Sequence, residues 1–338
     1  MRILVIGGSG MIGRQLVPHL VAGGHDVLVL SRGNRALEAP GARHALADRK
    51  DPAALRAAVD GYYDALIDNV AYLPEDLEAT LASLAGRIGH YVLTSTAFVY
   101  PGVESSARGP SRPIREVDAP PADLPGEAPD DSPHDRYVQG KRLLERRAVK
   151  QLPRAGVPLT IVRPSLQLMG PYTDDGRFAW FWLRLQGGGP IWLPDDARRH
   201  AGPCQVGYAG DVARILAGLA GRPPREPEVY NAAQPELWSY EEYLGLMAEL
   251  LGQPCEVRYA PREALDRSPC ATGGVYRLPL PYRVALDVSK VTDALGLRFT
   301  PMRDWMAQTG DWAGRYYEGR SEPWLRLRPQ EIAWTGPA

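Results

Sequence analysis

Apolar and polar residues alternate in blocks along the N-terminal part of the chain. Residues 2–6 ("RILVI") and 26–31 ("DVLVLS") are short apolar runs with almost no polar residue inside them, as is typical of strands buried on both faces in a parallel sheet. Between them, residues 11–21 have apolar positions at helical spacing and run into Gly23 and Gly24, which favour a helix C-terminus. The pattern predicts a strand, a helix and a second strand.

The alternation continues through the middle of the chain. Residues 63–68 ("YDALID"), 90–100 ("HYVLTSTAFVY") and 160–165 ("TIVRPS") are typical of further strands, and residues 74–86 have helical spacing. Strands that alternate with helices predict an α/β fold with a Rossmann-like, doubly wound parallel sheet. In such sheets, ligands bind at the carboxyl ends of the strands.

The second half predicts mostly helices. Helical patterns cover residues 208–221 and 239–254 and two stretches within 288–317. A short span of this half concentrates aromatic residues, namely Phe178, Trp180, Phe181, Trp182 and Trp192. Such a cluster more often packs in a core or a dimer contact than it binds a ligand.

One segment has neither the helical nor the strand spacing of apolar residues. Residues 101–133 are rich in Pro, Asp, Ser and Gly, so we expect an irregular excursion that contributes nothing to the core. A lid over a site, a contact with a partner and disorder all fit this composition.

Composition and charge exclude several classes of protein. Of the 338 residues, 44% are apolar and 23% charged, and the formal net charge is −1, so no sequence-wide positive field can hold nucleic acid or an anionic membrane. Cys204, Cys255 and Cys270 form no CxxC pair, and the six histidines show no metal-binding spacing. The chain starts directly in a predicted strand, without a signal peptide or membrane span. We therefore expect a cytoplasmic protein without a metal site.

A glycine-rich turn follows the first predicted strand. The stretch "GGSGMIG" places Gly7, Gly10 and Gly13 three residues apart, directly before the helix. Gly7 permits a tight turn, Gly10 lets the backbone approach a pyrophosphate, and Gly13 lets helix and strand pack closely. The free N–H groups of the helix N-terminus then face the phosphates. With a strand on each side, the motif predicts a dinucleotide-binding unit rather than a purely structural turn.

The end of the second strand bears on the choice of dinucleotide. A carboxylate there would bind the two ribose hydroxyls of NAD. The chain instead reads "LSRGNR", with Ser31, Arg32 and Arg35 and no acidic residue. Arg32 can pair with a 2′-phosphate and stack on adenine, which favours NADP over NAD. A solvated loop arginine is the alternative.

A tyrosine and a lysine lie four residues apart in a later helix. Ser132, Pro133 and Asp135 form a capping-box-like start, which predicts a helix from this point. Tyr137 and Lys141 then project from one face of it, about one turn apart. The spacing alone also fits an exposed helix turn, and the same ambiguity holds for Ser95 and Thr96 near the end of "YVLTST", which face either a ligand or neighbouring backbone.

Taken together, the motifs resemble the extended short-chain dehydrogenases/reductases of the NAD-dependent epimerase/dehydratase family. The resemblance covers almost the full length in family order, and its pieces are "GGSGMIG", "ADR", "STAFVY", "YVQGK", "IVRPSLQLMGP", "YAGDVA", "VYNAA" and "VSK". These motifs are specific for the superfamily and much less specific for the substrate.

The resemblance implies a role for each catalytic position. Thr96 would hydrogen-bond the substrate oxygen, Tyr137 would exchange the proton, and Lys141 would bind the nicotinamide ribose and lower the pKa of the tyrosine. Moving a phenol from ~10 towards ~7 requires about 4 kcal/mol. An ammonium ~4 Å away at an effective dielectric of ~20 supplies roughly that amount.

The same resemblance implies the cofactor site. Asp48 and Arg49 would lie at the adenine, "DNVAY" (68–72) would line the cofactor, and Pro164 and Ser165 would lie beside the nicotinamide. The full predicted set is Gly7, Ser9, Gly10, Met11, Ile12, Gly13, Ser31, Arg32, Asp48, Arg49, Asn69, Val70, Ala71, Pro164 and Ser165.

These assignments predict two domains. The division that we expect is a dinucleotide-binding domain over 1–165, to which 206–234 return, and a smaller, mostly helical substrate-binding domain over 166–205 and 235–338, with the active site in the cleft between them.

The sequence departs from the family pattern at two points near the active site. Tyr72 stands where many members have a small residue, which narrows the pocket. Ala97 and Phe98 stand where sugar-nucleotide 4,6-dehydratases have an acidic pair, so dehydration by that route is disfavoured. Further along, Arg198 and Arg199 occupy a stretch that contacts substrate in relatives; a guanidinium there could grip a phosphate or carboxylate, or the pair could be solvated.

The predicted function is hydride transfer at a carbonyl or hydroxyl carbon by an NAD(P)-dependent reductase or epimerase, with Tyr137 as acid or base. A nucleotide sugar is one compatible small-molecule substrate, and a homodimer is compatible with the resemblance. The alternative is a non-catalytic, NADP-binding regulatory or RNA-binding member, although such members commonly lack the Tyr-x-x-x-Lys pair. The sequence does not separate a reductase from an epimerase.

Overall fold

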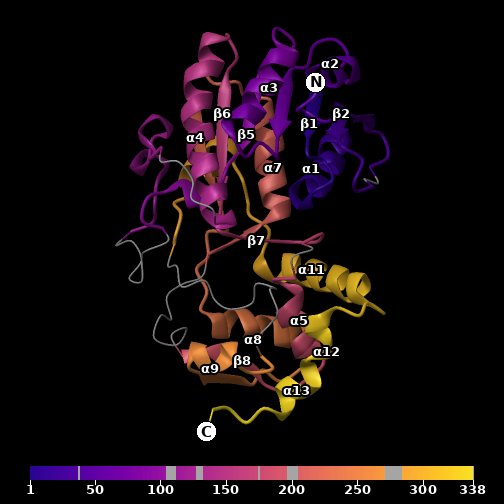
Figure 1. Ribbon diagram of the computed structural model, residues 1–338, viewed down its shortest axis with the longest axis vertical. Coiled ribbons are helices and arrows are strands. Elements are labelled where there is room, and N and C mark those ends of the chain that lie inside the picture. Colours follow the sequence, from indigo (N-terminus) through magenta and orange to yellow (C-terminus); the bar gives the residue numbers. More distant parts are fainter. Residues whose placement is uncertain are drawn as a thin grey trace.

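A computed structural model gives the fold of most of the chain. It describes residues 1–36, 39–103, 112–126, 132–173, 176–195, 205–270 and 284–337. Figure 1 shows a sheet covered by helices at the top and a second, mostly helical part below it.

Within these residues, seven strands form one parallel sheet, which confirms the predicted fold class. The strand order across the sheet is β10 (Glu228–Ala232), β6 (Leu159–Pro164), β5 (Tyr91–Thr94), β4 (Ala65–Asp68), β1 (Arg2–Ile6), β2 (Asp26–Ser31) and β3 (Arg43–Leu46). The chain builds outward from β1 in one direction and then returns to build outward in the other. The strand order therefore reverses between β1 and β4, and such a reversal is where α/β sheets bind ligands.

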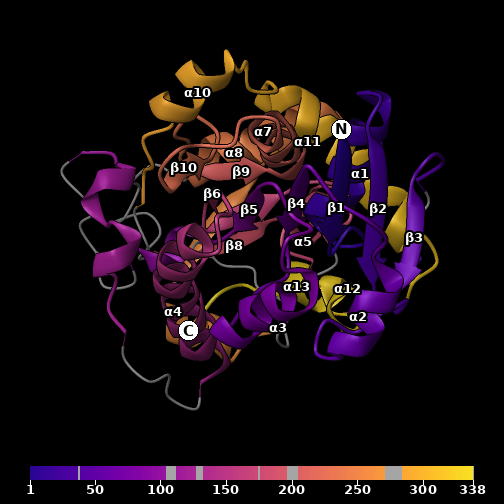
Figure 2. The ribbon, with the colours of Figure 1, turned by 90° about the horizontal axis from the view of Figure 1, so that it is seen from above.

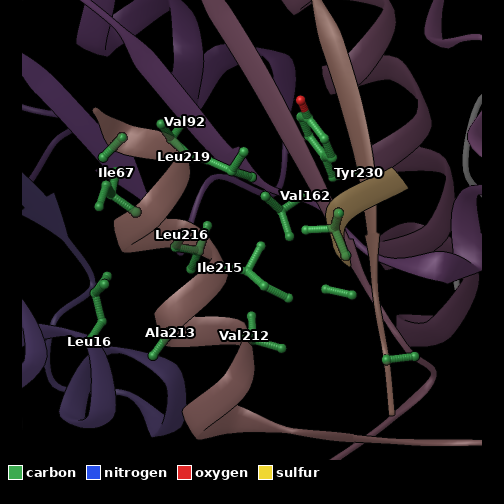
Figure 3. Close-up of a cluster of buried hydrophobic side chains, with 14 of the residues drawn as sticks. Leu16, Ile67, Val92, Val162, Val212, Ala213, Ile215, Leu216, Leu219 and Tyr230 are labelled. Atoms are coloured by element: carbon green, nitrogen blue, oxygen red, sulfur yellow. The ribbon is translucent and has the colours of Figure 1, made fainter. Parts of the chain in front are cut away.

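The helices cover both faces of the sheet because its strands are apolar on both faces. Ile3 and Val5 point into one buried cluster, and Leu4 and Ile6 point into another, as the two-residue period of a strand requires. The first face is covered by α1 (Met11–Ala22) and α7 (Ala209–Ala220), and the second by α2 (Pro52–Ala58), α3 (Pro74–Leu84) and α4 (Pro133–Arg154) (Figure 2). Figure 3 shows the α7 side, where Leu216 and Leu219 pack against Ile67, Val92 and Val162.

Most predicted elements form close to their expected bounds, and one strand is shorter. The apolar run predicted as a strand over 90–100 forms β5 only as far as Thr94, and η1 (Ala97–Val99) follows. The hydroxyl of Thr96 accepts a hydrogen bond from the N–H of Phe98 at 3.3 Å. This local cap turns the chain out of the sheet and leaves residues 95 and 96 at its carboxyl edge.

The lower part has its own core. Phe178, Trp180, Phe181 and Trp182 are all buried in it, so the aromatic run belongs to a core, as the sequence suggested. The elements of this part are α5 (Ala179–Gln186), β8 (Ile191–Pro194), α8 (Tyr240–Leu251), β11 (Val257–Ala260), α9 (Arg262–Asp266), α11 (Met302–Tyr317), α12 (Pro323–Arg326) and α13 (Arg328–Ala333). The chain also contains β7 (Gln167–Met169), paired with β9 (Val206–Tyr208), and α10 (Ser289–Leu295).

The irregular segment was expected to contribute nothing to the core, and this was wrong for residues 112–126. They form η2 (Glu116–Asp118) and η3 (Pro121–Asp123), and Ala119 and Leu124 are buried in the cluster on the α7 side of the sheet. The guanidinium of Arg163 donates to the carbonyl of Ala119 at 3.0 Å. Tertiary contacts of this kind leave no periodic signal in the sequence. Residues 104–111 and 127–131 lie outside the described part.

Two features are absent from the described residues. No helix in them is long and apolar enough to span a membrane. The same ranges contain no group of three His, Cys, Asp or Glu side chains arranged to hold a metal ion.

Candidate active site

Two adjoining cavities lie at the carboxyl ends of the central strands. One, of about 730 Å³, is lined by the glycine turn after β1 and by Ser31, Arg32 and Asp48; we name it the turn cavity. The other, of about 660 Å³, is lined by Thr96, Tyr137 and Lys141; we name it the tyrosine cavity. Tyr72 lines both, so the two cavities are neighbours, and we treat them as one candidate site.

The glycine turn is shaped by backbone contacts that only glycine allows. Gly7 has φ +84°, a left-handed conformation that disfavours other residues. A Cβ at Gly13 would lie 2.5 Å from the carbonyl oxygen of Gly7, so this glycine sets the contact between α1 and the turn. Gly10 lines the turn cavity, and a Cβ there would meet only the oxygen of Gly7, at 3.9 Å. Gly10 thus leaves room for a group that approaches the backbone, as a pyrophosphate does.

The turn cavity is lined by charged side chains of both signs. Arg32, Arg35 and Lys50 line it together with Asp48 and Asp76.

Arg49 lines the turn cavity, and one nitrogen of its guanidinium pairs with a buried carboxylate. Arg49 Nη2 lies 2.7 Å from Asp68 Oδ1, and Tyr91 donates its hydroxyl to Asp68 Oδ2 at 2.6 Å. Burial alone would lower the pKa of Arg49 and raise that of Asp68, but their mutual charge and hydrogen bond outweigh it. The pKa of Arg49 therefore lies above its ordinary value and that of Asp68 below it. The pair builds the wall of the cavity.

Tyr137 and Lys141 project from the first turns of α4. The hydroxyl of Ser132 accepts a hydrogen bond from the N–H of Asp135 at 3.0 Å, as predicted for the cap. Lys141 is buried and donates to the carbonyls of Ala71 at 2.7 Å and Thr94 at 2.8 Å. Burial lowers its pKa from 10.5 to about 8. The lysine thus links α4 to the ends of two strands.

The predicted lowering of the tyrosine pKa was wrong for the protein as it stands. Burial raises the pKa of Tyr137 above 10.0, and a hydrogen bond with the side chain of Thr96 opposes this only in part. The charge of Arg177 also opposes the rise in this pKa. The prediction assigned the ammonium to the phenol, but two backbone carbonyls hold that ammonium.

Tyr72 packs against both Tyr137 and Lys141. Its ring centroid lies 5.9 Å from that of Tyr137, and Lys141 Nζ lies 4.8 Å from its centre. The sequence suggested that Tyr72 narrows the pocket, and its place on the lining of both cavities fits that suggestion.

Two polar atoms of the tyrosine cavity have no partner among the described residues. They are the hydroxyl of Ser95 and Nδ2 of Asn69, both buried. The hydroxyl of Thr94 donates to Asn69 Oδ1 at 2.7 Å, which directs the amide nitrogen away from that contact. Because buried polar groups are rarely left unpaired, these atoms fit a site that binds polar groups of a ligand. A nicotinamide nucleotide offers such groups, so the residues present fit the implied cofactor.

The cavities bring together nearly all of the predicted residues. Of the cofactor set, only Gly13 and Ala71 do not line a cavity; Gly13 packs α1, and Ala71 accepts from Lys141. Phe98, His134 and Arg177 line the tyrosine cavity without having been predicted there. Phe98 and His134 lie close in sequence to predicted residues, but nothing in the sequence marked Arg177. Arg198 and Arg199 lie outside the described residues.

The fold and the site define a class: a Rossmann-type protein with a dinucleotide turn and a Tyr-x-x-x-Lys pair at one cleft. The family model described as "NAD dependent epimerase/dehydratase family" matches residues 3–233, and the chain belongs to this family.

Individual relatives are distant. The chloroplast stem-loop binding protein of 41 kDa b of Arabidopsis thaliana is 25% identical over 285 residues, which cover 78% of this chain and 67% of that protein. A putative epimerase from Burkholderia cenocepacia has a TM-score of 0.71 and 21% identity, covering 92% of this chain and 97% of its own. The UDP-glucose 4-epimerase of Thermus thermophilus, in complex with NAD, has a TM-score of 0.66 and 23% identity, covering 93% and 99%. These structural likenesses support the fold.

Proposed function

We propose that the protein is an NAD(P)-dependent oxidoreductase or epimerase that transfers a hydride at a carbonyl or hydroxyl carbon, with Tyr137 as the acid or base. The observation that carries the proposal is the tyrosine cavity, which brings Thr96, Tyr137 and Lys141 to the edge of the sheet beside the dinucleotide turn. A nucleotide sugar is the proposed substrate class, and the likeness in fold to the UDP-glucose 4-epimerase of Thermus thermophilus supports it.

The proposed cofactor is NADP, with NAD as the second option. Arg32 and Arg35 at the end of the turn cavity support a 2′-phosphate there, and the predicted cofactor residues are proposed to hold the rest of the nucleotide. We also propose the two-domain division given above, because β10 pairs with β6 and returns residues 228–232 to the sheet.

The proposed chemistry follows from the state of the tyrosine. A phenol whose pKa lies above 10.0 is protonated at neutral pH, so Tyr137 can donate its proton to a carbonyl oxygen as that carbon is reduced. Thr96 would hold the same oxygen. Lys141 would fix the strand ends that form the floor of the site. The bound nicotinamide would supply or accept the hydride.

The test compares Tyr137→Phe with Tyr62→Phe, an exposed tyrosine away from both cavities. Turnover of nucleotide sugars and simple carbonyl compounds is measured with NADPH and with NADH. We expect Tyr137→Phe to lower kcat by about 100- to 10,000-fold, the usual contribution of a positioned proton donor, with cofactor binding retained. Full activity in Tyr137→Phe would refute the catalytic role.

A second candidate is a non-catalytic nucleotide-binding or RNA-binding protein. The name of the Arabidopsis relative, a stem-loop binding protein, is the observation that favours it. It predicts that NADP(H) binds, that no compound in the panel turns over, and that a stem-loop RNA changes its gel mobility equally with wild type and Tyr137→Phe.

A further inference from the structure

The ammonium of Lys141 is held without a carboxylate. It is buried, and it donates to the carbonyls of Ala71 at 2.7 Å and Thr94 at 2.8 Å. Among the described residues, no carboxylate forms an ion pair with it. An ammonium has three N–H donors, so one donor remains after the two carbonyls.

The charged groups around Lys141 are engaged with other side chains or with backbone. Besides burial, the groups that act on its pKa are Asp68 on β4, Glu145 on α4, Arg49, and Asp76 on α3. Asp68 pairs with Arg49 at 2.7 Å, and Glu145 accepts from Arg163 Nη2 at 2.6 Å. The remaining donor of Lys141 therefore has no anionic partner among the described residues.

The ring of Tyr72 lies over this ammonium. Lys141 Nζ is 4.8 Å from the ring centre, within the range over which the face of an aromatic ring attracts a cation. The same ring contacts Tyr137, with ring centroids 5.9 Å apart. No hydrogen bond joins the hydroxyl of Tyr72 to another described residue. The ring, rather than the hydroxyl, is therefore the part of Tyr72 that meets the two proposed catalytic side chains.

Two features of the backbone fix Tyr72 at this place. The carboxylate of Asp76 accepts from the N–H groups of Tyr72 at 2.8 Å and Leu73 at 3.0 Å. A Cβ at Gly140, directly before Lys141, would lie 2.7 Å from the carbonyl oxygen of Tyr72. Only a glycine lets α4 approach this backbone so closely, so the helix that carries Lys141 is packed for contact with Tyr72.

We propose that Tyr72 is a positioning residue, and that the face of its ring takes the third donor of the Lys141 ammonium in place of water or a ligand oxygen. Lys141 then acts through its charge and through the strand ends that it holds. This differs from the role that the resemblance implied, a hydrogen bond from Lys141 to the nicotinamide ribose. The inference deepens the proposed function, on which it rests for the part that Lys141 plays in the reaction.

The test follows the titration of Lys141 itself. Lys50, Lys141, Lys150 and Lys290 are the only lysines in the sequence, so the NMR spectrum of protein labelled with ¹³C-lysine has one set of side-chain signals for each of them. Lys50→Arg, Lys150→Arg and Lys290→Arg assign three sets, and the set that remains belongs to Lys141.

The midpoint of this titration is measured in wild type, Tyr72→Phe, Tyr72→Leu and Tyr72→Ala. Tyr62→Ala is the matched control, because Tyr62 is 50% exposed, against 45% for Tyr72, and lines neither cavity. Thermal unfolding of each variant checks that it is folded.

We expect Tyr72→Phe and Tyr62→Ala to keep the wild-type midpoint, because both keep a ring over Lys141. Tyr72→Leu keeps water out but offers no π face, so its midpoint should fall by about 0.5–1.5 pH units. Tyr72→Ala admits water to the ammonium, so its midpoint should lie above that of Tyr72→Leu. A wild-type midpoint in Tyr72→Leu, or equal midpoints in Tyr72→Leu and Tyr72→Ala, would overturn the inference.

The pH dependence of kcat/KM is the second readout. Its alkaline limb should shift in the same direction as the Lys141 midpoint in each variant, and Tyr72→Phe should keep the wild-type profile. An alkaline limb that stays in place while the midpoint moves would overturn the positioning role. Absence of turnover in wild type would refute the proposed function, whereas the NMR midpoints would still decide whether the ring of Tyr72 takes the third donor.

Discussion

Lys141 illustrates how one residue serves both structure and chemistry. Its ammonium is buried, and two backbone carbonyls hold it at the ends of β4 and β5. Burial costs free energy for as long as the amine is charged, and the lowered pKa, about 8, is the measure of that cost. A buried lysine that lowers the stability of the fold at a candidate site is a form of the trade-off between stability and activity.

The lowered pKa of Lys141 predicts that the stability of the fold depends on pH. Between about pH 8 and about pH 10.5 the unfolded chain still binds the lysine proton and the folded chain has lost it, so the stability contributed by this site rises with pH. The free energy of unfolding of wild type minus that of Lys141→Met should therefore increase by up to about 3 kcal/mol across this window. Urea denaturation at several pH values measures it.

Lys150→Met is the control for this experiment, because it removes an amine from the exposed side of the same helix. A difference between wild type and Lys141→Met that stays constant from about pH 8 to about pH 10.5 would contradict the assigned cost of burial.

Among the helices and strands, the sequence predicts those that a short-range pattern of apolar residues marks. Strands such as β1 and β2 were predictable because both of their faces are buried and their residues are almost all apolar. The edge strand β3 carries Arg43 and His44 and is largely exposed, so only its pairing with β2 makes it a strand. The prediction that residues 112–126 lie outside the core was wrong for the same reason. Long-range contacts bury them, and their sequence has no helical or strand period.

Two glycines four residues apart on α11 give a matched test of how this helix packs. A Cβ at Gly310 would lie 2.1 Å from Cζ2 of Trp182, whereas a Cβ at Gly314 would meet nothing within 4 Å. Gly310→Ala should lower the free energy of unfolding by about 1–3 kcal/mol through overpacking. Gly314→Ala should raise it by up to about 1 kcal/mol because alanine favours a helix.

Thermal and urea unfolding of both variants measure the two changes. If Gly310→Ala were as stable as Gly314→Ala, the close contact between α11 and α5 would be wrong.

At the scale of the whole molecule, the site depends on how the sheet-bearing part meets the lower, helical part. Tyr137 comes from α4 beside the sheet, whereas Arg177 precedes α5 below it (Figure 1). Local spacing revealed the first and not the second, because the sequence does not encode which loop of the lower part reaches the cleft. The sequence also could not show that Asp68 pairs with Arg49, because this contact joins residues that are 19 positions apart in the chain.

Asp211 is a direct link between these two parts. It is buried at the start of α7 and accepts hydrogen bonds from Gln234 Nε2 at 2.7 Å and from the N–H and hydroxyl of Thr300, just before α11. Asp211→Ala leaves these buried donors without their acceptor and should lower the free energy of unfolding by about 2–4 kcal/mol. Asp293→Ala, at an exposed position of α10, should change it by less than about 0.5 kcal/mol.

Asp211 lies outside both cavities, so its loss should act on the site only through the placement of the lower part. We expect the KM for substrate to rise several-fold in Asp211→Ala, while the Kd for NADP, whose turn cavity is built on the sheet, changes little. Steady-state kinetics and cofactor titration separate the two. If the KM for substrate and the Kd for NADP rose by the same factor, Asp211 would support the sheet itself rather than the contact between the two parts.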